Sequence, residues 1–171
     1  MGNYAGNRDF VVGGPNPFAG LERNKNNQGH APRLFGNVYT EVKFLKNFKA
    51  RSSFGVDYSS YNFSNFFPIQ YENYLAQPKI AVLDVGNSYG RSFTWTNTIT
   101  WNKTIADDHR ISAFAGIESV TNKFRNFGTQ KTGFNFEDIN YRYLDAGVNV
   151  TNSYGSGSES SLFSVFAKAD Y

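Results

Sequence analysis

Five stretches of this chain alternate between apolar and polar residues with a period of two. They cover roughly residues 34–44, 48–58, 92–102, 111–119 and 161–171. In 92–102, for example, Phe93, Trp95, Ile99 and Trp101 alternate with serine and threonine. Because successive side chains of a strand point to opposite faces, this pattern predicts about five long strands, each with one apolar and one polar face.

The links between these strands alternate between short and long. Leu45-Lys46-Asn47 and residues 103–110 are short, whereas 59–91 and 120–160 are long. A three-residue turn at 45–47 allows Phe44 to pair with Phe48, so the register agrees with the apolar pattern. Compact soluble domains rarely hold unstructured loops beyond about 12–15 residues. Outer-membrane barrels, in contrast, combine tight periplasmic turns with large extracellular loops.

The strand lengths and the aromatic residues also favour a membrane barrel. A tilted strand needs about 9–11 residues to cross a bilayer, and aromatic residues stand beside both the short turns and the long loops, where a bilayer interface selects them. The alternative is that these rings form the core of a soluble β-sandwich. In the membrane reading, the lipid-facing residues are Val38, Val42, Phe54, Val56, Phe93, Trp95, Ile99, Trp101, Ile111, Ile117, Phe163 and Val165.

The composition narrows the fold class and the possible kinds of partner. The 171 residues are 40% hydrophobic and 18% aromatic, with 16 glycines, which favours an all-β protein with long loops. No run approaches the roughly 18 apolar residues of a membrane helix. The net charge of +3 is small and scattered, so we expect no nucleic-acid partner, and the lack of cysteine excludes disulfides. Residues 1–20 contain no apolar core of a signal peptide.

The expected loops carry the candidate ligand contacts. Residues 1–32 are rich in Gly, Asn and Pro and read as a loop, 136–146 is expected to form a short helix capped by Gly147, and 153–161 is expected to be flexible. In 59–91, aromatic rings alternate with amides, which suits binding to sugars or peptides. The alternative is that these rings pack the loop itself. The candidate ligand or lid contacts are Tyr61, Phe63, Phe66, Phe67, Tyr71 and Tyr74.

The sequence gives no support for catalysis. His30 and His109 are the only histidines, and neither has the spacing of a metal ligand. No hydrolase or nucleotide-binding motif is present. Glu41, Asp57 and Glu118 are expected to share the polar, lumen-facing side of the strands, where charges are solvated. We therefore expect no enzyme activity, no metal and no cofactor.

Several segments resemble one transporter family. Residues 33–37 (RLFGN), 41–49 (EVKFLKNFK) and 53–58 (SFGVDY), with Asn16-Pro17, 115–118 (AGIE), 161–164 (SLFS) and 169–171 (ADY), resemble SusC/RagA-type TonB-dependent outer-membrane receptors of Bacteroidetes. The resemblance implies a transmembrane β-barrel of about 22 strands that surrounds an N-terminal plug. It also implies import of oligosaccharides or peptides, energised by TonB, with a SusD-like lipoprotein capping the extracellular side.

By this resemblance, residues 1–171 are a mid-barrel segment of an outer-membrane protein, with the plug and the TonB-contacting region outside this sequence. The expected order is a loop (1–32), a hairpin (33–58), a long loop (59–91), a hairpin (92–119), a long loop (120–160) and a strand (161–171). Expected partners are the lipoprotein, TonB, outer-membrane lipid and an oligosaccharide or peptide ligand. Two alternatives stay open: a soluble β-sandwich that binds glycans, and a small outer-membrane barrel or adhesin.

Overall fold

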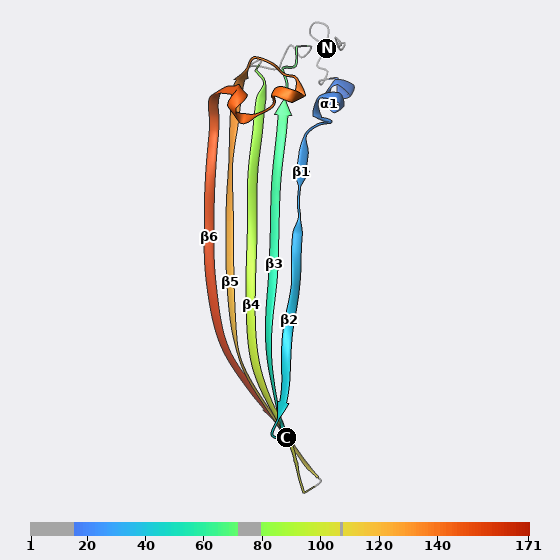
Figure 1. Cartoon of the computed structure of the whole chain (residues 1–171), viewed down its shortest axis with the longest axis vertical. Helices are drawn as coiled ribbons and strands as arrows, with labels where there is room; N and C mark the ends of the chain where they lie inside the picture. Colours follow the sequence, from blue (N-terminus) through green and yellow to red (C-terminus); the bar gives the residue numbers. More distant parts are fainter. Residues whose placement is uncertain (1–15, 72–79, 107) are drawn as a thin grey trace. The chain divides into compact units, whose positions relative to one another are not determined.

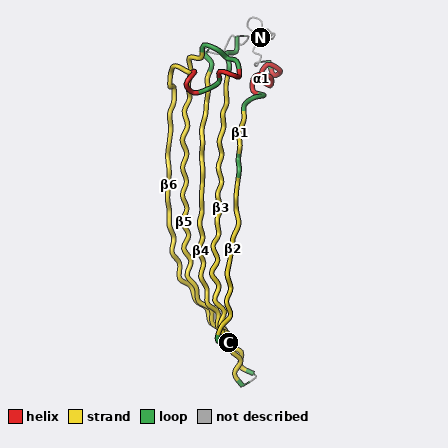
Figure 2. Tube along the Cα trace, viewed as in Figure 1, coloured by secondary structure: helices red, strands yellow, loops and turns green. Residues whose placement is uncertain are grey.

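The computed structural model describes residues 16–71, 80–106 and 108–171. Most of them form one six-stranded sheet with the order β1-β3-β4-β5-β6, in which β2 also pairs with β3. Figure 1 shows these strands lying side by side, and Figure 2 shows how few described residues are helical. The bounds are β1 Gln28–His30, β2 Arg33–Phe44, β3 Phe48–Phe67, β4 Val82–Ile105, β5 His109–Phe134 and β6 Gly147–Asp170. The expected all-β antiparallel meander is confirmed, with one short additional strand.

The chain divides into two compact units, which are described separately below. Unit 1 contains Met1–Ala31, Tyr61–Ser88 and Asn126–Ser156, and unit 2 contains Pro32–Ser60, Tyr89–Arg125 and Gly157–Tyr171. The short turns 45–47 and 106–108 belong to unit 2, whereas the longer connections 68–81 and 135–146 belong to unit 1.

The first hairpin has the register that its sequence predicts. Phe44 pairs with Phe48, and the antiparallel pairing continues to Arg33 opposite Ser59. The rings of Phe44 and Phe48 stack with their centroids 5.5 Å apart. In the turn between them, Leu45 and Lys46 have φ angles of 48° and 59°. Such left-handed backbone follows the twist of the flanking strands and allows a tight connection.

The strands are much longer than expected, so the expected bounds of the two long loops are wrong. Strand β3 continues to Phe67 and β4 begins at Val82, while β5 continues to Phe134 and β6 begins at Gly147. The stretch 153–161, expected to be flexible, lies inside β6. The reason is that neighbouring strands satisfy the backbone along the whole length, so a strand can continue through serine, asparagine and glycine that show no apolar alternation.

The segment before the first hairpin is not entirely a loop. Helix α1 covers Pro17–Asn24, and Asn16 caps it by accepting hydrogen bonds from the backbone N–H groups of Phe18 and Ala19. Asn16-Pro17 is a helix-start signal, because proline at the first helical position loses no hydrogen bond. Strand β1 then pairs with β3, with Gly29 opposite Phe63. The first fifteen residues of this expected loop lie outside the described residues.

The connection 135–146 contains two short 3-10 helices in place of the one expected helix. They are η1 (Ile139–Tyr141) and η2 (Leu144–Ala146). The carboxylate of Asp138 accepts a hydrogen bond from the backbone N–H of Asn140 and starts η1. Gly147 follows η2 with a φ of −88°, so it is not the left-handed cap that we expected.

Few apolar side chains are buried in the described part of the chain. The buried hydrophobic residues are Ala19, Phe66, Ala81 and Leu83, and large apolar residues are exposed along most strands. No helix among the described residues is both long and apolar enough to span a membrane. The sheet therefore leaves most of its apolar surface uncovered by the rest of the described chain.

Candidate functional site

Contacts between strands sort the side chains of unit 2 onto two faces. On one face Phe54 stacks on Phe93 at 5.9 Å between ring centroids, and the Trp95 indole N–H donates to Ser52 Oγ at 3.1 Å. His109 stacks on Tyr171 on the same side. We call this side the apolar face; it holds the even positions of 34–44 and 48–58 and the odd positions of 91–103, 109–125 and 157–171.

The opposite side of unit 2 is the polar face. Thr96 Oγ1 donates to a Glu118 carboxylate oxygen at 2.9 Å, and Lys49 Nζ lies 3.4 Å from a carboxylate oxygen of Glu41. Asp57 belongs to the same face, because the β2–β3 register places it with Glu41. The structure therefore brings Glu41, Asp57 and Glu118 to one face, as the alternation predicted.

All twelve expected lipid-facing residues occupy positions of the apolar face. They are not buried by other parts of unit 2: the side chains of Val38 and Val165, for example, are 71% and 73% exposed. Phe48 and Trp101, whose ring centroids are 6.5 Å apart, form an aromatic rim beside the short turns. Contact of these residues with lipid stays a prediction.

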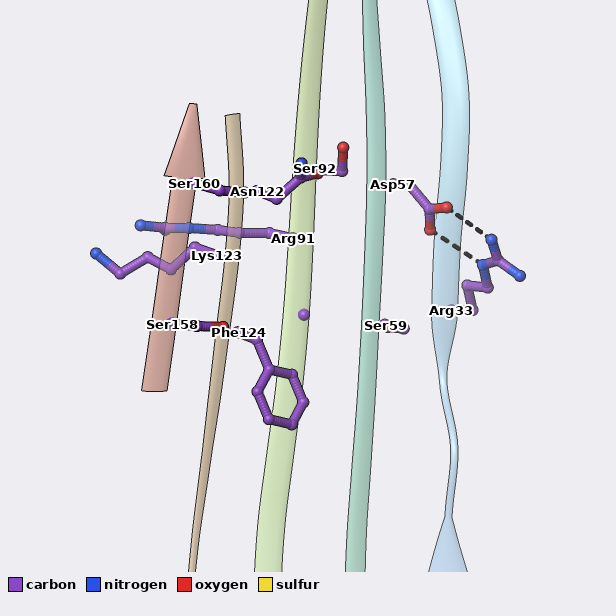
Figure 3. Close-up of a pocket in the computed structure, with 11 residues that line it drawn as sticks. Arg33, Asp57, Ser59, Arg91, Ser92, Asn122, Lys123, Phe124, Ser158 and Ser160 are labelled. Carbon is purple, nitrogen blue, oxygen red and sulfur yellow. Dashed lines mark hydrogen bonds and ion pairs between the residues drawn. The ribbon is translucent and has the colours of Figure 1, made fainter. Parts of the chain in front are cut away.

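The polar face of unit 2 carries a shallow hollow of about 370 Å³ (Figure 3). At one side of it, Arg33 donates two hydrogen bonds to the Asp57 carboxylate, from Nε to Oδ1 at 3.0 Å and from Nη2 to Oδ2 at 2.6 Å. Such a two-pronged pair holds both side chains in one orientation. Hydroxyl, amide and aromatic groups from Ser59, Ser92, Asn122, Phe124, Ser158 and Ser160 line the rest. Gly90, Arg91 and Lys123 also border the hollow, and the side chains of Arg91 and Lys123 extend from it toward β6 (Figure 3).

This hollow has the chemistry of a binding surface. Serine hydroxyls and an asparagine amide donate and accept hydrogen bonds, so they match the hydroxyls of a sugar or the amides of a peptide equally well. The Arg33–Asp57 pair is exposed. Because exposed ion pairs contribute little free energy, a ligand group can replace either partner at a small cost. The arrangement offers weak, replaceable contacts along a surface.

In unit 1, aromatic side chains lie close against glycines of the sheet. A Cβ atom added to Gly86 would lie 2.7 Å from both Phe63 Cε1 and Tyr154 Oη, and one added to Gly29 would lie 2.9 Å from Tyr61 Oη. The Tyr61 and Phe63 centroids are 5.8 Å apart. Strand β3 therefore carries four of the six candidate ligand contacts: Tyr61, Phe63, Phe66 and Phe67. Two of these, Tyr61 and Phe63, form an aromatic patch with Tyr154.

Phe66 has a different environment, which counts against its expected role in ligand contact. Its side chain is only 2% exposed and packs with Ala81 and Leu83. The guanidinium of Arg142 lies 4.5 Å from the centre of its ring and donates to the backbone carbonyl of Glu137. Phe66 thus joins the connection 135–146 to the sheet, which is the packing role that we considered as the alternative.

Of the remaining candidates, two are exposed and one lies outside the described residues. Phe67 is 45% exposed and Tyr71 is 70% exposed. Glu137 accepts a hydrogen bond from the nearby backbone N–H of Ile69 at 2.8 Å. Tyr74 lies outside the described residues. Among the residues that the structure does describe, no three His, Asp, Glu or Cys side chains come together in a way that would hold a metal ion.

Sequence reasoning missed the polar residues on the parts of the long strands that extend beyond the apolar segments. Asn122, Ser158 and Ser160 of the hollow, and the charged residues Lys123 and Glu159, all lie in 120–160, which was expected to be loop. They could have been found by continuing the two-residue alternation of each strand beyond its apolar segment. With polar residues on both faces, that period is invisible to hydrophobicity alone.

Comparison with known proteins gives a match in structure alone. No protein-family model matches the chain, and no curated protein matches its sequence. A chain of the "RagAB peptide importer in the 'open-open' state" has a TM-score of 0.80 and 16% identity, and the match covers 94% of this chain and 18% of that chain. A chain of the "RagAB peptide transporter" has a TM-score of 0.81 and 15% identity, with the same coverage.

A third neighbour, the importer "in the 'closed-closed' state", has a TM-score of 0.72 and 18% identity over 85% of this chain and 16% of that chain. The chain thus spans less than a fifth of the length of these transporter chains. At such low identity the likeness establishes the fold. The chain has the fold of a segment of the RagAB transporter chains, and the SusC/RagA resemblance of its sequence is confirmed at the level of that fold.

Proposed function

We propose that this chain is part of the barrel wall of a SusC/RagA-type outer-membrane transporter. The observation that carries the proposal is the structural match over 94% of the chain with a TM-score of 0.80. The whole transporter would import peptides or oligosaccharides, together with a SusD-like lipoprotein and with energy delivered by TonB. This segment contributes wall strands and two connections to that assembly.

The two faces of unit 2 support the proposal. An exposed apolar face suits lipid, and the polar face with its hollow suits a water-filled lumen. The soluble β-sandwich reading requires a second layer over the apolar face, and the described residues supply none. In the proposed function, the hollow and the aromatic patch give a passing ligand several weak contacts, which allow both capture and release.

The topology can be tested by epitope insertion in the full-length protein that carries this sequence. One tag is inserted between Tyr143 and Leu144, in the connection 135–146, and a second between Lys46 and Asn47, in a short turn. Antibody binding is then measured on intact and on permeabilised bacteria. We expect the first tag to be accessible on intact cells and the second to be accessible only after permeabilisation, because barrels place long loops outside and short turns in the periplasm.

The control is the untagged protein with its abundance in the outer-membrane fraction measured for every variant. Equal access of both tags on intact cells, or recovery of the full-length protein in the soluble fraction, would contradict the proposal. Copurification of a lipoprotein with the same tagged protein tests the proposed partner separately, so that failure of the partner leaves the membrane assignment standing.

A further inference from the structure

Three basic side chains lie near one carboxylate on the apolar face of unit 2, and one of them contacts it. Lys123 Nζ lies 2.7 Å from Glu159 Oε2. The Arg125 side chain crosses Gly157 of the next strand, where an added Cβ atom would lie 3.1 Å from Arg125 Cγ. Figure 3 shows the side chains of Arg91 and Lys123 extending in the same direction, toward β6. We call Arg91, Lys123, Arg125 and Glu159 the outer basic cluster.

The outer basic cluster has an excess of positive charge. The pKa of Glu159 lies below its usual range, first because Lys123 donates a hydrogen bond to its carboxylate and adds its charge, and then because of the charges of Arg91 and Arg125. Three cations therefore share one ionised carboxylate, which leaves two positive charges in excess. On the polar face, in contrast, Arg33 and Lys49 each have their own carboxylate partner.

The position of the cluster along the strands matches the height of a bilayer core. Arg91 lies ten positions along β4 from Trp101 of the aromatic rim, and both belong to the apolar face. Strands rise about 3.3 Å per residue, and barrel strands tilt by about 35–45°. Ten positions therefore span roughly 23–27 Å across the membrane, and the apolar band of such barrels is about 25 Å tall.

We propose that Arg91, Lys123 and Arg125 bind the phosphate groups of a lipid in the outer leaflet of the outer membrane. The inference rests on the proposed function, which places the short turns in the periplasm and thus the cluster at the outer headgroup level. Arginine and lysine are the side chains that bind phosphate with charge-assisted hydrogen bonds. A lipid fits better than a free phosphate, because Phe93 and Phe163 continue the same face toward the bilayer core and can contact acyl chains.

The test uses the full-length protein in detergent and phosphatidylcholine vesicles that contain phosphorylated lipid A. Arg91→Gln, Lys123→Gln and Arg125→Gln are made singly and together, and vesicle binding is measured at low and high salt. We expect each change to weaken binding about fivefold, as for basic residues near an anionic membrane surface. Salt should weaken the wild type most, because it screens exposed charges. Lys103→Gln is the matched control, because it removes a cation from β4, the strand of Arg91, but near the short turn. It should leave binding unchanged.

Two further measurements test whether Glu159 competes with the lipid for the cations and whether the bound phosphate belongs to a lipid. Glu159→Gln should strengthen binding, because it removes the anion that competes for the cations; weakening as large as that of Lys123→Gln would mean a purely structural ion network and overturn the proposal. Vesicles with dephosphorylated lipid A should bind as poorly as the triple variant. Equal binding of both vesicle types, or displacement by an equal concentration of inorganic phosphate, would overturn the lipid assignment. Tag accessibility, measured on the same variants, reports on the proposed topology independently.

Discussion

Glycines in the strands of unit 2 differ in what a side chain would meet. A Cβ atom at Gly116 would lie 2.6 Å from Phe166 Cζ and 3.0 Å from the carbonyl oxygen of Asn97, whereas nothing lies within 4 Å of one at Gly36. We expect Gly116→Ala to lower the free energy of unfolding of the full-length protein by about 1–3 kcal/mol, because a packed ring must move. Gly36→Ala should raise it by about 0.5–1 kcal/mol, because alanine has less freedom to lose. Denaturant titration in detergent micelles measures both, and equal effects would contradict the proposed packing of Phe166.

A charged residue introduced on the apolar face should lower the free energy of unfolding more than one introduced on the polar face. Ile99 belongs to the apolar face of β4 and its neighbour Thr98 to the polar face. If Ile99 meets lipid, Ile99→Arg should destabilise the full-length protein by about 2–4 kcal/mol, as should Val38→Arg. Thr98→Arg should cost less than about 1 kcal/mol, because the lumen is hydrated. Unfolding in lipid vesicles measures the three changes, and tolerance of Ile99→Arg would mean that the faces are assigned the wrong way round.

Glu159 allows a prediction of pH dependence. Its pKa is lowered from the ordinary value of 4.5 by Lys123, Arg91 and Arg125. A lowered pKa means that the stabilisation from this carboxylate is fully present above about 4.5 and is lost as the pH falls through the lowered value. A carboxyl NMR titration of isotope-labelled protein, with Glu159→Gln to assign the signal, should give a midpoint below 4.5. Lys123→Gln should move that midpoint upward; an unchanged midpoint would exclude the ion pair.

At the scale of elements, the connection 135–146 depends on one buried ring. Phe66 is buried against Ala81 and Leu83, and its neighbour Phe67 is 45% exposed. Phe66→Ala should lower the free energy of unfolding by about 3–5 kcal/mol if the cavity stays open. Hydrogen exchange in 135–146 should accelerate, because Arg142 loses its aromatic partner. Phe67→Ala is the matched control and should leave exchange in 135–146 unchanged. If Phe67→Ala accelerated exchange equally, Phe66 would not be the anchor.

The elements also separate what the sequence can predict from what it cannot. The hairpin from Arg33 to Tyr58, including its register, was predictable from the sequence. An apolar face requires strict alternation, and a one-residue slip would move every side chain to the opposite face. The parts of β4, β5 and β6 beyond the apolar segments were not, because their serine, asparagine and glycine residues give no apolar alternation to follow. The same limit hid the hollow and the outer basic cluster, whose residues come together only through the pairing of these long strands. Phe66 was found as an aromatic candidate, but its burial results from packing with Ala81 and Leu83, which the sequence pattern did not pair with it.

At the scale of the whole molecule, the open sheet determines how this chain should behave by itself. Its outermost strands leave backbone groups unpaired on one side, and its apolar face is exposed. In water both features favour association, because free strand edges pair with other chains and apolar surface is removed from solvent. We therefore expect residues 1–171, expressed alone, to form insoluble or polydisperse material and to become dispersed in detergent. Sedimentation velocity with and without detergent measures this. A water-soluble monomer with a cooperative thermal transition would instead support the β-sandwich, because only a closed core of its own could hide that face.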